Sequence, residues 1–211
     1  MANKPTLYGF DGSTYVRTVR MVLHEKGADY EQVPVNVLEG EPRRPEHLAR
    51  HPFGKVPVMD VDGMRLLETD AICRYLDETL PGPSLTPDTA AGRARMTEAI
   101  SLYDSYAYPA LLTAVGFHLF PDLAGNPDQA AHDAALGQVE TFLKLVMEKS
   151  GDDRWLAGDR PSLADFTLAP FWFYASLTPD FDRLSQVPGI SDWWTRVQGL
   201  ESFTATAPDL G

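Results

Sequence analysis

The sequence contains one cysteine in 211 residues, so it cannot form an internal disulfide. It also lacks any run of about 18 apolar residues, the length that a membrane-spanning helix needs. Its first ten residues, MANKPTLYGF, lack the long apolar stretch and the small-residue cleavage site of a signal peptide. Together these absences favour a protein of the reducing cytoplasm.

Positive charge is scarce. The chain has 18 Lys and Arg residues against 30 Asp and Glu residues, a formal net charge of −12. Such a chain is a poor partner for nucleic acid or for an anionic membrane surface. The first 83 residues hold 10 of the basic and 13 of the acidic side chains, so this part is nearly balanced. Its basic side chains are available for an acidic small molecule.

Patterns for metal binding and for nucleophilic catalysis are missing from the sequence. The histidines lack metal-ligand spacing, and no Cys/His/Asp cluster stands out, so we expect no metal. No G-x-S-x-G motif surrounds a serine, which argues against a hydrolase. The single cysteine, Cys73, lies in an apolar helical pattern, which predicts a buried structural thiol. The histidines are His24, His47, His51, His118 and His132.

Residues 1–80 predict a small α/β domain. Strand-like and helix-like patterns alternate in the order β-α-β-α-β-β-α, and the last two strands form a hairpin around Asp62-Gly63. Parallel βαβ units followed by a hairpin predict a mixed sheet covered by helices. The first helix should begin after Ser13 and end near Gly27.

The pattern changes near residue 81. Residues 81–90 are rich in proline and turn formers, which predicts a linker. Residues 91–211 show helical periodicity without convincing strands, so we expect a second, all-helical domain. Its first long helix should bend near Pro109.

Polar residues stand at two junctions where a strand gives way to a helix. Ser13 is the expected N-cap of the first helix, and Glu68 with Thr69 opens the helix after the hairpin. Helix N-termini favour anions, although each residue could simply be an N-cap. Thr14 is an alternative hydroxyl donor beside Ser13. Both junctions should lie on the same side of the sheet, because each follows the end of a strand.

Pro57 interrupts a strand-like stretch, PFGKVPVM, at residues 52–59. Proline cannot donate to a strand ladder, so it belongs at an edge, a strand start or a bulge. A cis Val56–Pro57 bond would turn the Val56 backbone outward, where it could pair with an extended peptide ligand.

These features occur in a familiar combination. FGKVP at residues 53–57, followed by LLETDAICRYL at residues 66–76, resembles the thioredoxin-like domain of the soluble glutathione transferases. The resemblance is closest to serine-type members of the phi class and their bacterial relatives, and it spans essentially the whole chain. In the second half, SLADF at residues 162–166 looks like the family's helix-capping box, and PGISDWW at residues 188–194 resembles a late segment of its helical domain.

The resemblance implies how glutathione would be bound. The backbone of Val56 would pair with the cysteinyl part, and cis-Pro57 would fix that geometry. The hydroxyl of Ser13 would donate a hydrogen bond to the sulfur. Ser13 would thus stabilise a nucleophile held in the site and would not itself be the nucleophile.

The resemblance also implies partners for the two ends of the tripeptide. Glu68 and Thr69 would hold the ammonium and carboxylate of the γ-glutamyl end. Lys55, assisted by Arg43 from the preceding loop, would meet the glycyl carboxylate. The sequence departs from the phi-like pattern here, because Glu41-Pro42-Arg43 stands where those proteins usually have Glu-His-Lys. The histidine that would help hold the glycyl end is therefore missing.

The activity implied is conjugation of glutathione to hydrophobic electrophiles, with possible reduction of peroxides. The alternative is a carrier or regulator that binds glutathione or another ligand without turnover. Aromatic residues would line the electrophile pocket, and the protein would be a homodimer. Phe53 would either insert into the partner subunit or be an ordinary core residue. The pocket candidates are Phe10, Tyr106 and Phe117.

Overall fold

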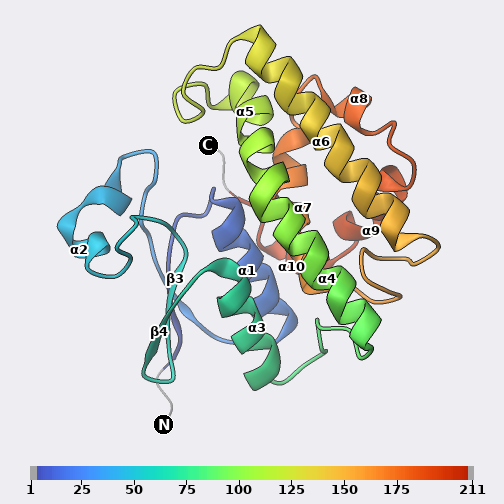
Figure 1. Cartoon of the computed structure of the whole chain (residues 1–211). Coiled ribbons are helices and arrows are strands. Elements are labelled where there is room, and N and C mark those ends of the chain that lie inside the picture. Colours follow the sequence, from blue (N-terminus) through green and yellow to red (C-terminus); the bar gives the residue numbers. More distant parts are fainter. Residues whose placement is uncertain (1–3, 209–211) are drawn as a thin grey trace. The chain divides into compact units, whose positions relative to one another are not determined.

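The computed structural model describes residues 4–208, so residues 1–3 and 209–211 of the two expected domains lie outside the described residues. The chain forms two compact units (Figure 1). The first combines the described residues up to Ser84 with those from Leu200 onward, and the second runs from Leu85 to Gly199.

The first unit contains a four-stranded mixed sheet in the order β2-β1-β3-β4. Strand β1 pairs in parallel with β2 and antiparallel with β3, and β3 pairs antiparallel with β4. This confirms the mixed sheet expected from the sequence. The strands are β1 (Thr6–Tyr8), β2 (Glu31–Val33), β3 (Val58–Val61) and β4 (Met64–Leu67).

The hairpin between β3 and β4 turns at the expected residues. Val61 faces Met64 across the pair, so only Asp62 and Gly63 lie in the loop. Both have positive φ, 51° and 77°. Two positive φ values are the requirement of a type I′ turn, which Asp-Gly satisfies well.

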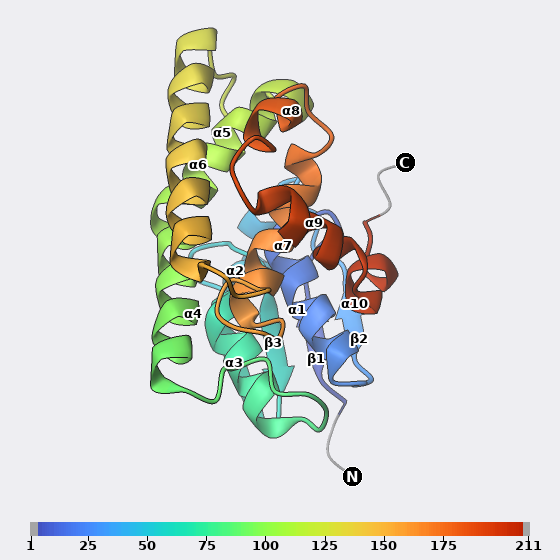
Figure 2. The ribbon, with the colours of Figure 1, turned by 90° about the vertical axis from the view of Figure 1, so that its right-hand side faces the viewer.

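Five helical segments complete the first unit, and α1 and α3 lie side by side (Figures 1 and 2). Helix α1 buries an apolar stripe that includes Val16, Val19 and Leu23, all fully buried. It ends before Gly27, whose φ of 60° suits a residue just beyond a helix. The segments are α1 (Thr14–Glu25), η1 (Glu41–Arg43), α2 (Pro45–Leu48), α3 (Thr69–Thr79) and α10 (Glu201–Ala205).

The C-terminal helix α10 packs against α1. Arg17 of α1 is buried, and its Nη2 donates a 2.8 Å hydrogen bond to the carbonyl of Phe203. The guanidinium carbon also lies 4.2 Å from the centre of the Phe203 ring, a cation–π contact. The sequence assigns this segment to the helical domain, whereas in the structure it belongs to the first unit.

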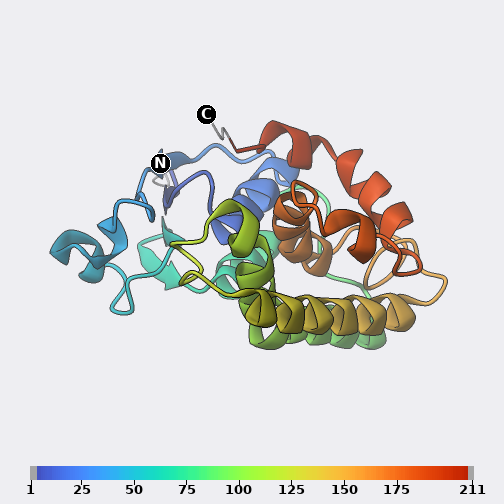
Figure 3. The ribbon, with the colours of Figure 1, turned by 90° about the horizontal axis from the view of Figure 1, so that it is seen from above.

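The second unit is helical, as expected. Its described residues contain no strand, only one isolated bridge between Trp155 and Gly158. Figures 2 and 3 show the long α6 running beside α4 and α5. The helices are α4 (Ala90–Leu102), α5 (Tyr108–Leu119), α6 (Gln129–Ser150), α7 (Leu163–Ala175), α8 (Phe181–Leu184) and α9 (Ile190–Gln198).

A π-helical turn, Tyr103–Ala107, separates α4 from α5. The N–H of Tyr108 bonds to the carbonyl of Tyr103, five residues earlier. Pro109 follows at once, has no N–H to donate and crowds the preceding turn. The sequence predicts an interruption near Pro109, and its form is this wider turn.

The capping box at the start of α7 is present. The buried carboxylate of Asp165 accepts hydrogen bonds from the backbone N–H and hydroxyl of Ser162, each at 2.8 Å. It also accepts from the N–H of Leu156 at 3.0 Å and the indole N–H of Trp193 at 2.8 Å. Burial raises the pKa of Asp165, and these hydrogen bonds oppose that rise. The box therefore anchors α7 to α9 as well as starting the helix.

Over residues 4–208, none of the helices has the length and apolar character that crossing a membrane would require.

Candidate functional site

Three chain segments lie at the same end of neighbouring strands in the sheet. Tyr8 faces Val58 across β1 and β3, and Val58 faces Leu67 across β3 and β4. These residues form one row at the end of β1, the start of β3 and the end of β4. Beyond this row, β1 leads to the N-terminus of α1 and β4 leads to the N-terminus of α3. The chain enters β3 from Pro57. The two junctions therefore lie on the same side of the sheet.

Ser13 caps α1. Its backbone is extended, with φ −76° and ψ 125°, and its Oγ accepts from the N–H of Val16 at 3.4 Å, a long contact. The hydroxyl therefore acts as an acceptor toward the helix, and its own proton remains available for a second partner. The side chain is half-buried.

Thr14 differs from Ser13 in its surroundings. It is the first residue of α1 and is only 9% exposed. Its carbonyl accepts from the hydroxyl of Thr18 at 3.1 Å. The greater exposure of Ser13 favours it over Thr14 as the hydroxyl that meets a ligand.

The Val56–Pro57 peptide bond is cis. Within the part of the chain that the structure describes, neither the N–H nor the carbonyl of Val56 has a hydrogen-bond partner. Pro57 is buried and Val56 half-buried, so a free donor and a free acceptor stand where strand β3 begins. Such a pair can bind an extended peptide as a strand does.

Glu68 has φ 68° and ψ 124°, a region that residues with a side chain rarely occupy. It precedes α3, its carbonyl accepts from the N–H of Ile72, and its side chain is exposed. Thr69 is the first helical residue, and no side chain caps this helix end. The first-turn N–H groups of α3 can therefore bind an anionic ligand group.

Two basic side chains lie on the loop before β3. Arg43 and Lys55 are both exposed. The Arg43 side chain passes Gly54, because a Cβ on Gly54 would lie 3.1 Å from Arg43 Cδ. Gly54 itself has φ 60°. Arg43 thus lies beside the residue that precedes Lys55.

Two histidines support this loop, and the sequence does not predict their contacts. His47 Nε2 lies 2.7 Å from the carbonyl of Lys55, and His51 Nδ1 accepts from the N–H of Phe53 at 3.3 Å. Burial lowers the pKa of His51, while the charge of Glu68 raises it and that of Lys55 lowers it.

The aromatic candidates belong to different units. In the first unit, the ring of Phe10 lies over Gly12. The backbone carbonyl of Phe10 accepts from the N–H of Ser13 at 3.0 Å. In the second unit, Tyr106 lies on the π-helical turn and is 67% exposed. Phe117, on α5, packs against the rings of two histidines.

Two further expectations are resolved by burial. Cys73 is buried and unpaired with another cysteine, and burial raises the pKa of its thiol, as expected for a structural residue. Phe53 is 72% exposed, so the interpretation as an ordinary core residue is wrong for this chain. An exposed phenylalanine is available to a partner surface.

Both units match domains of a known protein family. The family description "Glutathione S-transferase, N-terminal domain" matches residues 7–84, and "Glutathione S-transferase, C-terminal domain" matches residues 94–201. The chain belongs to the glutathione S-transferase family and is an enzyme of the glutathione transferase class. Glutathione is the co-substrate of this family.

Relatives come from plants and bacteria. Glutathione S-transferase 4 of Zea mays is 34% identical, with 94% of this chain and 88% of that protein covered. Maleylacetoacetate isomerase of Rhizobium meliloti is 32% identical, with 99% and 98% covered. The crystal structure of glutathione transferase F7 from Populus trichocarpa is 30% identical, has a TM-score of 0.86, and covers 96% of this chain and 97% of that chain. Glutathione S-transferase I from mais, in complex with an atrazine glutathione conjugate, is also 30% identical, with a TM-score of 0.82 and 97% of each chain covered.

Proposed function

We propose that this protein conjugates glutathione to hydrophobic electrophiles and that the Ser13 hydroxyl stabilises the attacking thiolate. The observation that carries the proposal is the position of Ser13. It stands at the N-terminus of α1, beside the row of strand residues that also leads to Pro57 and Glu68. Its hydroxyl accepts from the helix and has a proton left to donate. A cytoplasmic location stays a prediction from the sequence.

The energetic requirement is modest. A free thiol with a pKa near 8.5 is only about 3% ionised at pH 7, and the thiolate is the nucleophile. Lowering that pKa by about 2 units needs about 2.7 kcal/mol of preferential stabilisation of the thiolate. One hydrogen bond to a charged group together with a helix N-terminus supplies roughly this amount.

The binding groups match a peptide with a charge at each end. Val56 offers a free N–H and carbonyl to the cysteinyl residue. Glu68 would accept from the ammonium group, and Thr69, at the uncapped start of α3, would donate to the γ-glutamyl carboxylate. Lys55 and Arg43 would pair with the glycyl carboxylate, because both are exposed cations on the preceding loop.

The second substrate would be apolar. Phe10, close to Ser13 in the first unit, would contact the electrophile, and the roles of Tyr106 and Phe117 stay predictions from the sequence. The glutathione conjugate of atrazine in the mais transferase supports an apolar organic molecule as the partner. The same thiolate would reduce organic hydroperoxides as a side reaction, with two glutathione molecules oxidised to the disulfide and the peroxide reduced to alcohol and water.

The test compares Ser13→Ala with Thr14→Val. Thiolate absorbance against pH would report the pKa of bound glutathione, and initial rates with an aryl halide would report conjugation. Ser13→Ala should keep glutathione binding, return the thiol pKa toward 8.5 and reduce the rate at pH 7 by about 25-fold. Thr14→Val should retain the depressed pKa. Unchanged turnover in Ser13→Ala would contradict the proposal, and loss in Thr14→Val alone would move the role to Thr14.

A second activity, isomerisation, is favoured by two relatives. Maleylacetoacetate isomerases of Rhizobium meliloti and Pseudomonas aeruginosa are 32% and 33% identical to this chain. A bound thiolate can add to a conjugated double bond, allow rotation, and leave again. Isomerisation regenerates glutathione, whereas conjugation consumes one molecule per turnover. Incubating the enzyme with maleylacetoacetate and limiting glutathione separates the two: product in excess of glutathione supports isomerisation, and product capped by it excludes this activity.

The non-catalytic alternative gives a different result in the first assay. A carrier or regulator would bind glutathione tightly without lowering the pKa of its thiol. It would also show no turnover with any electrophile in the wild-type protein.

A further inference from the structure

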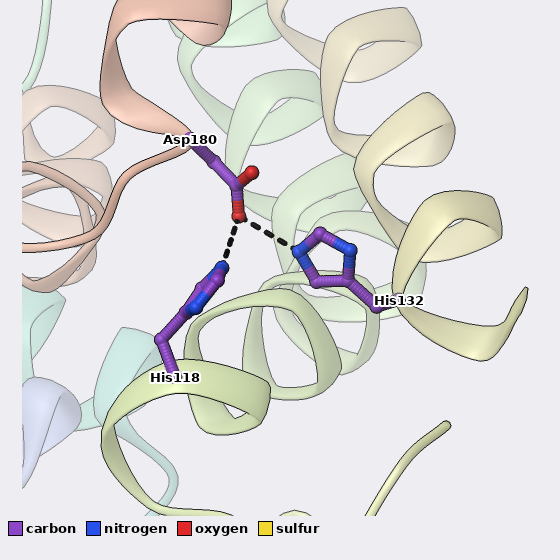
Figure 4. Close-up of side chains that lie close together, drawn as sticks. All are labelled: His118, His132 and Asp180. Atoms are coloured by element: carbon purple, nitrogen blue, oxygen red, sulfur yellow. Dashed lines mark hydrogen bonds and ion pairs between the residues drawn. The ribbon is translucent and has the colours of Figure 1, made fainter. Parts of the chain in front are cut away.

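Three side chains that can bind a metal ion meet within the second unit. His118 lies in the last turn of α5, His132 in the first turn of α6, and Asp180 directly before α8. One ligand atom from each lies within 4.8 Å of the others. Figure 4 shows the imidazole rings of both histidines directed at the same carboxylate oxygen. The three residues are far apart in sequence, which is why histidine spacing does not predict this cluster.

The distances suit an ion after a small adjustment. Asp180 Oδ2 lies 2.8 Å from Nε2 of His118 and 2.8 Å from Nε2 of His132. Ligands held about 2.0–2.1 Å from a tetrahedral metal are about 3.3 Å apart, so each of these two pairs must separate by about half an ångström, and the ligand atoms of the two histidines already lie within 4.8 Å of each other. The side chain of His132 is 5% exposed, whereas those of His118 and Asp180 are 22% and 17% exposed. The site is thus largely enclosed but open to solvent on one side.

His132 also has the outer partner that metal-bound histidines usually have. Its other ring nitrogen, Nδ1, lies 3.3 Å from Asp133 Oδ1 and 3.3 Å from Gln129 Nε2. Gln129 donates to Asp133 at 2.8 Å, which holds that carboxylate in place. Without a metal, Nδ1 can accept from Gln129 while Nε2 donates to Asp180. With a metal on Nε2, the proton can sit on Nδ1 and be donated to Asp133.

The two imidazole rings are held by Phe117. Its ring lies 4.5 Å from that of His132 at an interplanar angle of 35°, and 5.0 Å from that of His118 at 90°. An apolar wall of this kind limits rotation of the rings and lowers the local polarity. Both effects favour ligands that are already oriented toward one point.

We propose that His118, His132 and Asp180 bind one divalent transition-metal ion, for which Zn²⁺ is the probe. Two imidazoles and a carboxylate form a donor set that zinc uses with water as the fourth ligand, and imidazole nitrogen disfavours Ca²⁺ and Mg²⁺. The ion ties together the end of α5, the start of α6 and the start of α8. The site is separate from the residues assigned to glutathione, and it replaces the expectation that the chain binds no metal.

The first experiment measures Zn²⁺ binding to the tag-free protein by titration calorimetry at pH 7.4. The wild type should bind one ion. His118→Ala and Asp180→Asn should each weaken binding more than 100-fold, beyond the range of about 10- to 100-fold for losses of outer partners. Asp133→Asn should weaken it by about tenfold. The matched control is His24→Ala, an exposed histidine of α1, which should bind as the wild type does.

The second experiment measures thermal unfolding of the same proteins. Zinc at about 100 times its Kd should raise the wild-type midpoint by roughly 5 °C or more, and a chelator should reverse the shift. Asp180→Asn keeps an oxygen that can accept from both histidines, so it should fold and show no zinc-dependent shift. Failure of the wild type to bind one ion would overturn the proposal. So would a zinc affinity equal to that of the wild type in the folded Asp180→Asn and His118→Ala variants.

Discussion

Glu68 is held in a backbone conformation that its residue type avoids. Its φ of 68° costs of the order of 1–3 kcal/mol, which the flanking elements must offset. The hairpin register fixes it on one side, where Leu67 pairs with Val58, and the first turn of α3 fixes it on the other. Glycine would adopt this φ without strain but would lack the carboxylate. A glutamate at this strained position therefore fits a role in binding.

His51 makes stability depend on pH. Burial lowers its pKa in the folded protein from the usual 6.5, so the unfolded chain binds this proton more tightly. The free energy of unfolding should therefore fall as the pH drops from 7 through 6.5 toward the lowered folded value. His51→Asn, which keeps an acceptor for the N–H of Phe53, should flatten this decline. Urea unfolding between pH 5 and pH 7.5 measures it.

The control for that experiment is His24→Asn, because His24 is exposed. This variant should lose stability with falling pH as steeply as the wild type does. An equally steep loss in His51→Asn would show that other groups cause the acid sensitivity.

Helices α1 and α3 are joined at their C-terminal ends by a buried ion pair. Lys26 Nζ lies 2.6 Å from Asp77 Oδ1, and the two side chains are 1% and 3% exposed. The same ammonium donates to the carbonyls of Asp77 at 3.1 Å and Pro83 at 2.6 Å. One lysine thus connects α1, α3 and the segment that leaves the first unit.

Breaking this pair should be costly, because it leaves a buried charge without its partner. Lys26→Met should lower the free energy of unfolding by about 3–5 kcal/mol. Lys26→Met combined with Asp77→Leu should recover much of that loss, since neither charge remains. Chemical denaturation of Lys26→Met, Asp77→Leu and the double variant gives a double-mutant cycle. A double variant with the summed loss of the two single variants would contradict this account.

The sequence predicts the elements with strong local patterns. The hairpin turn follows from Asp62-Gly63, and α1 follows from its apolar stripe and from Gly27. The short helices α8 and α10 have too few residues for a periodic pattern, and neither is predicted. Some features of the candidate site can likewise be predicted from the sequence, and others cannot. That the junctions at Ser13 and Glu68 lie on the same side of the sheet follows from each coming after a strand's end, whereas the contact of His47 with Lys55 depends on tertiary folding and leaves no mark in the sequence.

At the scale of the whole molecule, Phe53 points to self-association. It is 72% exposed, and its ring meets that of His51 edge-on at 6.1 Å. A large aromatic side chain in water is a common anchor of protein interfaces. We expect a homodimer in which Phe53 inserts into the partner subunit.

Phe53→Ser tests this expectation. The change should weaken the dimer by at least about tenfold in Kd, or about 1.4 kcal/mol, because a central aromatic anchor is lost. Analytical ultracentrifugation over a range of concentrations measures the Kd. Leu38→Ser is the matched control, since Leu38 is 59% exposed in the same unit and should leave the dimer unchanged. Equal dissociation constants for Phe53→Ser and the wild type would exclude this anchor.

The packing of α10 on α1 makes the second unit an insertion between two pieces of the first. Handles attached before β1 and after α10 would therefore both pull on the same unit. Mechanical load would pass through the contacts between α1 and α10, including the pair of Arg17 and Phe203, and would bypass the helices between Leu85 and Gly199. Under tension, α10 should peel away first, and only then would the inserted helices carry any force.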